Sequence, residues 1–79
     1  MIKVIVRTGV GNRSVIVPAS TSPEEVFSQQ GIDLSGRTVN INGDNIPRAN
    51  ISKSLEELGY GECEEIKMFS VVKGDGGNN

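Results

Sequence analysis

The feature that most constrains this chain is an apolar segment, residues 66–72, followed directly by residues without any apolar side chain. The segment IKMFSVV carries apolar groups at both odd and even positions. We therefore expect a strand that is covered on both faces, at least in part, and that lies centrally in its sheet. Residues 73–79, KGDGGNN, have no apolar side chain to bury, and the tail from Gly74 to Asn79 is expected to be mobile. The sequence predicts a domain over 1–73 and a flexible tail over 74–79.

Upstream of this segment, short alternating stretches predict further strands. Residues 2–7 alternate and are rich in β-branched side chains, and residues 14–18 resume the pattern after a glycine-rich turn. Such a pair is typical of an antiparallel hairpin. Residues 37–42 alternate again, and Ile46 begins a short segment that Pro47 confines to a sheet edge.

A helix is predicted to begin at residues 22–25, whose sequence is Ser-Pro-Glu-Glu. Ser22 can accept a hydrogen bond from the amide of Glu25, and the Glu25 carboxylate can reach back to the amide of Ser22. Proline suits the first helical position, and acidic residues are favoured near the positive end of the helix dipole. We predict a helix over 23–30 that ends at Gly31.

A second, shorter helix of one or two turns is predicted over residues 51–58. Its apolar residues have helical spacing, and Ser54 with Glu57 repeats the capping pattern. The element order is then strand, strand, helix, strand, short strand, short helix, strand. A right-handed crossover brings the last strand beside the first, so the chain is predicted to be an α+β domain with a mixed sheet and a helix on one face.

The composition argues against an enzyme. The chain of 79 residues has no histidine and one cysteine, Cys63, which is flanked by glutamates that disfavour its thiolate. The commonest general base and the commonest metal ligand are both missing. We expect no catalytic residue, no metal site and no cofactor.

The charge and the first residues bear on location and partner. The start, MIKVIVRTG, has an apolar run interrupted by Lys3 and Arg7, which is typical of neither a signal peptide nor a membrane span. A formal net charge of −2 and an aromatic content of 4% argue against nucleic-acid binding. We expect a cytoplasmic protein whose partner is another protein.

An acidic run provides one candidate for docking that partner. Its five carboxylates have no Lys or Arg among them, and they belong to Glu56, Glu57, Glu62, Glu64 and Glu65. One interpretation is an ordinary solvated surface. The other is a docking patch for a basic partner.

Three features together resemble the ubiquitin-like β-grasp superfamily, in particular the small bacterial sulfur carriers of thiamin and molybdopterin synthesis. They are the element order over 1–72, the segment VNINGDNIPR at 39–48, which looks like the Val-Asn-Gly-x-x-Val-Pro-Arg turn of the thiamin carriers, and the pair Gly76-Gly77. The resemblance implies a β-grasp sheet of four to five strands packed on one helix. It also implies a Gly-Gly tail that enters an adenylating (E1-like) enzyme.

The end of the chain departs from that family. The carriers end at the second glycine, whose carboxylate is activated, whereas this chain continues with Asn78 and Asn79. Two hypotheses follow. The first is a non-enzymatic interaction module, an adaptor, and the Asn pair slightly favours it. The second is a sulfur carrier or ubiquitin-like modifier that is activated at Gly77 after removal of both asparagines.

Overall fold

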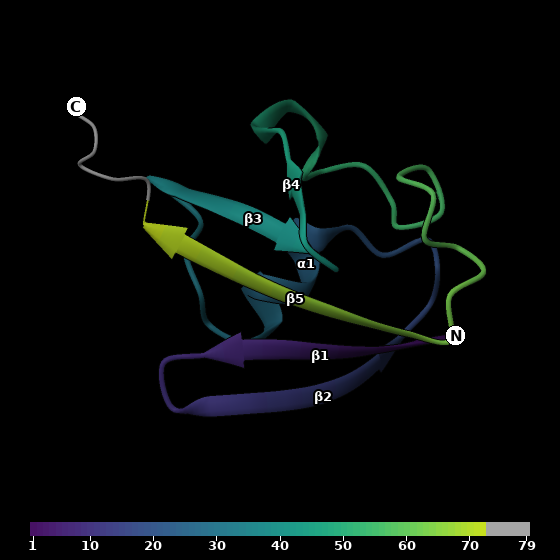
Figure 1. Cartoon of the computed structure of the whole chain (residues 1–79), viewed down its shortest axis with the longest axis horizontal. Coiled ribbons are helices and arrows are strands. Elements are labelled where there is room, and N and C mark those ends of the chain that lie inside the picture. Colours follow the sequence, from purple (N-terminus) through teal and green to yellow (C-terminus); the bar gives the residue numbers. More distant parts are fainter. Residues whose placement is uncertain (73–79) are drawn as a thin grey trace.

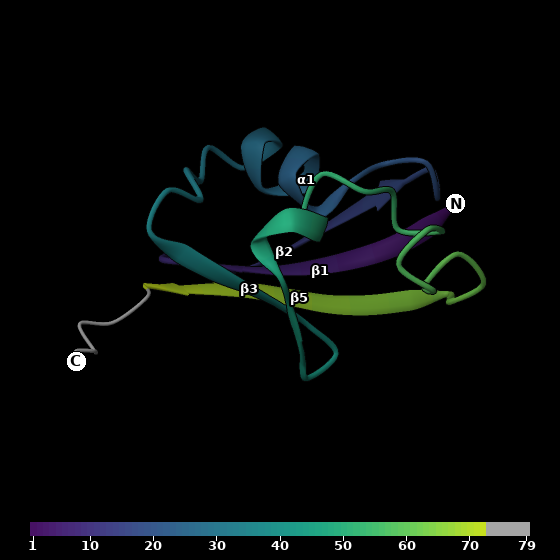
Figure 2. The same ribbon diagram turned by 90° about the horizontal axis from the view of Figure 1, so that it is seen from above.

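The computed structural model describes residues 1–72, which form a five-stranded mixed sheet with one α-helix packed on one face (Figure 1, Figure 2). The elements are β1 (Ile2–Thr8), β2 (Gly11–Val17), α1 (Pro23–Gln29), β3 (Arg37–Ile41), β4 (Asp44–Ile46), a short 3-10 helix (Arg48–Asn50) and β5 (Glu65–Val72). The strand order is β2-β1-β5-β3-β4. The predicted tail, with Gly76 and Gly77, lies outside the described residues.

Strand β5 lies in the middle of the sheet, as predicted. It pairs in parallel with β1 and antiparallel with β3. The expectation that both of its faces are covered, at least in part, is met fully on one face and only partly on the other, where Phe69 is half-buried. Ile66 and Met68 are each 1% exposed, whereas Val71, on the opposite face, is 48% exposed. The reason is that α1 covers one face of the sheet and leaves the other open (Figure 2).

The two hairpins turn more tightly than the sequence indicated. β1 and β2 pair up to Thr8 and Gly11, so β2 begins at Gly11, ahead of the predicted start at residue 14. The second turn is made by Asn42 and Gly43, whose φ angles are +53° and +94°. These left-handed conformations suit Gly and Asn, and they let β4 begin at Asp44.

Helix α1 begins as predicted. The Glu25 amide donates to Ser22 Oγ at 3.2 Å, and the Ser22 amide donates to Glu25 Oε1 at 2.9 Å. The helix ends at Gln29, and Gly31 follows with a φ of +75°. Its buried side chains Val26 and Phe27 are fully inaccessible. Within residues 1–72, no helix has the length and apolar character needed to cross a membrane.

The predicted helix over 51–58 is wrong, because its backbone amides are used elsewhere. The Leu55 amide donates to Thr21 O at 2.9 Å, and the Glu56 amide donates to Ala19 O at 3.0 Å. Both acceptors lie in the loop before α1, so the segment is held by that loop as a series of turns. The Ser54–Glu57 capping pair forms nevertheless, and Ile51 and Leu55 still enter the core.

One core joins the helix to the inner face of the sheet. The strands supply alternate residues, and α1 and the turns supply the rest. The buried apolar residues are Ile2, Val4, Val6, Val17, Val26, Phe27, Leu34, Val39, Ile41, Ile51, Leu55, Ile66 and Met68. This layer fixes the sheet as a rigid platform for the side chains on its other face.

Candidate functional site

The sheet face opposite α1 is the candidate site, and we call it the open face. Strand alternation and the register of β1, β2 and β5 place one set of side chains there. On these three strands the open face includes Lys3, Ile5, Arg7, Ser14, Ile16, Glu65, Lys67, Phe69 and Val71.

Apolar side chains from three strands are accessible on the open face. Ile16 is 66% exposed and Val71 is 48% exposed, while Ile5 and Phe69 are half-buried. They come from β2, β5 and β1, so the patch crosses strands that lie next to one another. Accessible apolar groups gathered on one rigid surface favour contact with another protein.

An arginine stacks on the aromatic ring at the centre of this face. The guanidinium carbon of Arg7 lies 4.8 Å from the centroid of the Phe69 ring, within the range of a cation–π interaction. Arg7, Lys67 and Phe69, together with Glu65, line a shallow hollow of about 440 Å³ beside the β3–β4 turn. Stacking limits the rotamers of Arg7, so its remaining donors are presented to a partner at reduced entropic cost.

The turn that borders this hollow is fixed to β5. Asn42 Oδ1 accepts from the Lys67 amide at 3.0 Å, and the Asn42 amide donates to Lys67 O at 2.9 Å. The β3–β4 turn therefore extends the hydrogen bonding along β5. The hollow has a wall made of backbone as well as side chains.

The open face is basic although the whole chain is acidic. Lys3 Nζ lies 4.0 Å from Glu65 Oε1, which is the one ion pair found between side chains of residues 1–72. Arg7 and Lys67 have no carboxylate partner among these residues. With a formal net charge of −2 for the chain, this separation of charge favours binding of an acidic surface to the open face.

The predicted acidic run is divided among different local structures. Glu57 belongs to the capping pair, and the backbone amide and then the hydroxyl of Ser54 hold the pKa of its carboxyl below the usual range. Glu65 begins β5 and pairs with Lys3, whereas Glu56, Glu62 and Glu64 are exposed. Docking through this run stays a prediction.

Metal ligands do not gather in the part of the chain that the structure describes, where no group of three or more His, Cys, Asp or Glu side chains could hold an ion. Cys63 is half-buried and packs against the core. The other predicted site residues, Gly76 and Gly77, lie outside that part.

Sequence reasoning missed the open face. It assigned Phe69 to a covered strand, and it treated Arg7 only as an interruption of an apolar run. The alternation of Lys3, Ile5 and Arg7 carried a signal, because every second residue of a strand with one covered face points to solvent. The pairing of Arg7 with Phe69 depends on the parallel register of β1 and β5, which the alternation does not contain.

Comparison with known proteins gives matches in structure alone, since no family model and no curated protein matches the sequence. The ubiquitin-like domain of an Arabidopsis thaliana protein superposes with a TM-score of 0.66 at 17% identity, covering 92% of this chain and 78% of that one. A ubiquitin-like protein from the hyperthermophilic archaeon Caldiarchaeum subterraneum has a TM-score of 0.50 at 15% identity, covering 92% and 95%. At these identities the likeness concerns the fold. The chain is a small protein with the ubiquitin-like β-grasp fold.

Proposed function

We propose that this chain is a non-enzymatic, cytoplasmic protein-interaction module that docks its partner on the open face. The observation that carries the proposal is the Arg7–Phe69 stack, which is surrounded by accessible apolar side chains and by Lys67. Aromatic and arginine side chains at the centre of a patch are the residues that dominate binding energy in protein interfaces. The expected partner surface combines apolar and acidic groups.

A protein partner suits this face better than a nucleic acid. The chain is acidic overall, so long-range attraction to phosphate backbones is weak. Phe69 is the one aromatic side chain of the open face, whereas binding of single strands uses several stacking platforms.

The experiment is affinity capture from the native cell followed by direct titration of each captured protein. Arg7→Glu reverses the charge at the centre of the open face. Arg13→Glu is the matched control. Arg13 is also exposed, but it pairs with the inward-facing Val6 and therefore lies on the sheet face opposite the open face. We expect Arg7→Glu to weaken binding roughly tenfold or more and Arg13→Glu to leave it within about twofold. Equal affinities for the two variants would contradict docking on this face.

The acidic run remains a second docking hypothesis within the same function. Glu62 and Glu64 are exposed and available to a basic partner. If they dock one, association slows as salt rises, because exposed charges are screened beyond roughly 8 Å at physiological ionic strength. Charge reversal of both residues to Lys should also slow association. Unaltered association rates in both tests would show that the run is an ordinary solvated surface.

A sulfur carrier or modifier is the alternative function. It draws support from the central position of β5 and the exposure of its last residue, Val72, at 65%, since an adenylating enzyme can approach that end of the strand. Intact mass of the protein from its native cell tests this directly. We expect to find a form of the protein that ends at Gly77. With such an enzyme present, this form should support exchange of pyrophosphate with ATP, and Gly77→Ala should abolish the exchange. Detection of the full-length chain alone would refute it.

A further inference from the structure

A second hollow lies beside the start of β3, on the opposite edge of that strand from β5, with a volume of about 470 Å³. It exists because β4 is shorter than β3. Ile46 pairs with Val39, and Pro47 then leads the chain out of the sheet. The first two residues of β3, Arg37 and Thr38, are therefore left without a neighbouring strand on the β4 side, and the hollow occupies that position.

The hollow is basic, with an apolar side. Arg37 and Arg48 line it, and no acidic residue does. Ile46, Pro47 and Ile51 supply the apolar surface. In an acidic chain this is a local excess of positive charge beside a strip of aliphatic groups, which favours a ligand that carries both a carboxylate and an aliphatic side chain.

Both guanidinium groups are anchored while most of their donors stay available. Arg48 Nη1 donates to Leu34 O at 2.9 Å, and Arg37 Nη1 donates to Ser70 Oγ at 3.4 Å. A guanidinium has five N–H donors, so one hydrogen bond holds each side chain in place without exhausting it. Two positioned guanidinium groups are suited to a carboxylate, which can accept from both.

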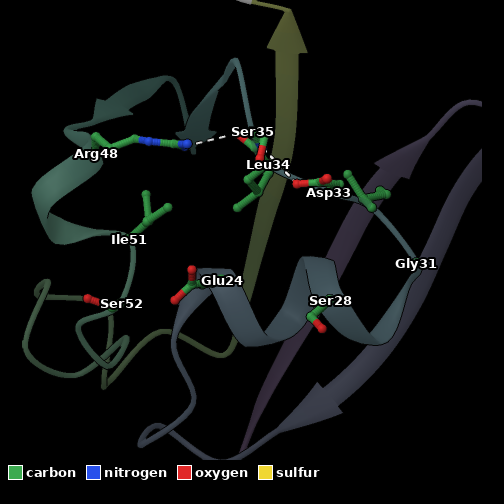
Figure 3. A pocket seen from close by; sticks show the side chains of 10 residues that line it. Glu24, Ser28, Gly31, Asp33, Leu34, Ser35, Arg48, Ile51 and Ser52 are labelled. Carbon is green, nitrogen blue, oxygen red and sulfur yellow. Dashed lines mark hydrogen bonds between the residues drawn. The ribbon is translucent and has the colours of Figure 1, made fainter.

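The acidic residues nearby belong to a different hollow. Figure 3 shows Arg48 reaching from the 3-10 helix toward Leu34, across a depression of about 720 Å³ that includes Glu24 and Asp33. The amide of Ser35 lowers the pKa of Asp33 most, and Arg48 and Arg37 contribute to the same effect. Asp33 therefore lies within electrostatic reach of both guanidinium groups. Neither Asp33 nor Glu24 lines the basic hollow, and no ion pair joins either carboxylate to Arg37 or Arg48 within residues 1–72.

We propose that the hollow between β3, β4 and the 3-10 helix binds an extended, acidic segment of a partner protein. A glutamate or aspartate side chain of that segment accepts hydrogen bonds from Arg37 and Arg48. A neighbouring aliphatic side chain packs on Ile46 and Ile51. The inference rests on the proposed interaction function, to which it adds a second surface and a partner chemistry.

The test is an NMR titration of the full chain with a short capped peptide that has two glutamates in alternate positions, one leucine and no basic residue. The same peptide with glutamines is its control. We expect the glutamate peptide to shift the side-chain Nε–Hε signals of Arg37 and Arg48 and the amide signal of Thr38. Arg37→Gln should weaken this binding roughly tenfold or more, and so should Arg48→Gln. Arg13→Gln, on an unrelated surface, should leave it unchanged.

Several outcomes would overturn the proposal. They are equal shifts with the glutamine peptide, equal shifts with inorganic phosphate alone, and shifts that grow with protein concentration without peptide, which would indicate a second copy in the hollow. If Arg48→Gln disturbs the loop that its hydrogen bond to Leu34 holds, Arg37→Gln with an unchanged sheet spectrum decides the question. Arg7→Glu should not alter the titration, so failure of this site and failure of docking on the open face are distinguished.

Discussion

Replacing Ser22 with alanine removes the side-chain cap of α1, and we expect it to lower the free energy of unfolding by about 1 to 1.5 kcal/mol. The change removes the 3.2 Å bond from the Glu25 amide to Ser22 Oγ. It leaves the reciprocal bond from the Ser22 amide to Glu25 Oε1 in place. Since Ser22 is 5% exposed, water cannot easily replace the serine oxygen, which puts the loss in the middle to upper part of the usual range for such caps.

Urea unfolding measures this loss. For a small domain the free energy falls by about 1 kcal/mol per molar urea, so the midpoint of Ser22→Ala should drop by roughly 1 M. Ser28→Ala, on the exposed side of the same helix, is the matched control and should change the free energy by less than about 0.5 kcal/mol. An unchanged midpoint for Ser22→Ala, or an equal drop for both variants, would refute the role of the cap.

Two further predictions concern the turns around Tyr60 and Gly61. Burial, then the hydrogen bond to Asp44, raises the pKa of Tyr60, so the phenolate absorbance of this single tyrosine should titrate above the ordinary value of about 10. Asp44→Asn should bring the midpoint down, and a midpoint at the ordinary value in the unmodified chain would contradict the contact. Because the folded state favours the neutral phenol, this contribution to stability is present below pH of about 10 and is lost as pH rises through the higher pKa. Gly61→Ala would place a Cβ 2.9 Å from a neighbouring side-chain carbon and should cost about 1 to 3 kcal/mol, whereas Gly9→Ala, with nothing within 4 Å, should be nearly neutral in the same unfolding assay.

The parts of the fold that could be predicted from the sequence are those set by local chemistry. The Ser22–Glu25 pair lies within one turn, so its residues alone specify the helix start. The segment 51–58 shows the opposite case, because Leu55 has the helical spacing but its amide bonds to Thr21 in another loop. Local sequence also does not show which face of β5 is covered, since the position of an apolar residue such as Phe69 in the strand is the same whether a helix lies over it or not.

The sequence does not predict the two candidate surfaces, because each is formed by residues that are distant from one another in the sequence. Arg7 meets Phe69 through the parallel register of the first and last strands. Arg37 and Arg48 line the same hollow because β4 ends at Ile46, directly before Pro47. Such neighbours follow from strand register and strand length, which depend on the whole sheet.

The position of β5 has a consequence for how the chain is made. β1 pairs with β2 and β3 pairs with β4, but the two hairpins are joined to one another only through β5 in the sheet of residues 1–72. During synthesis the ribosome therefore releases two hairpins that cannot form a common sheet until residues 65–72 have emerged. Pairings between segments so far apart in sequence are slow to form. Until β5 has paired with both hairpins, the apolar strands have no common sheet in which to be buried, so protection of the chain from aggregation depends on the strand that is made last.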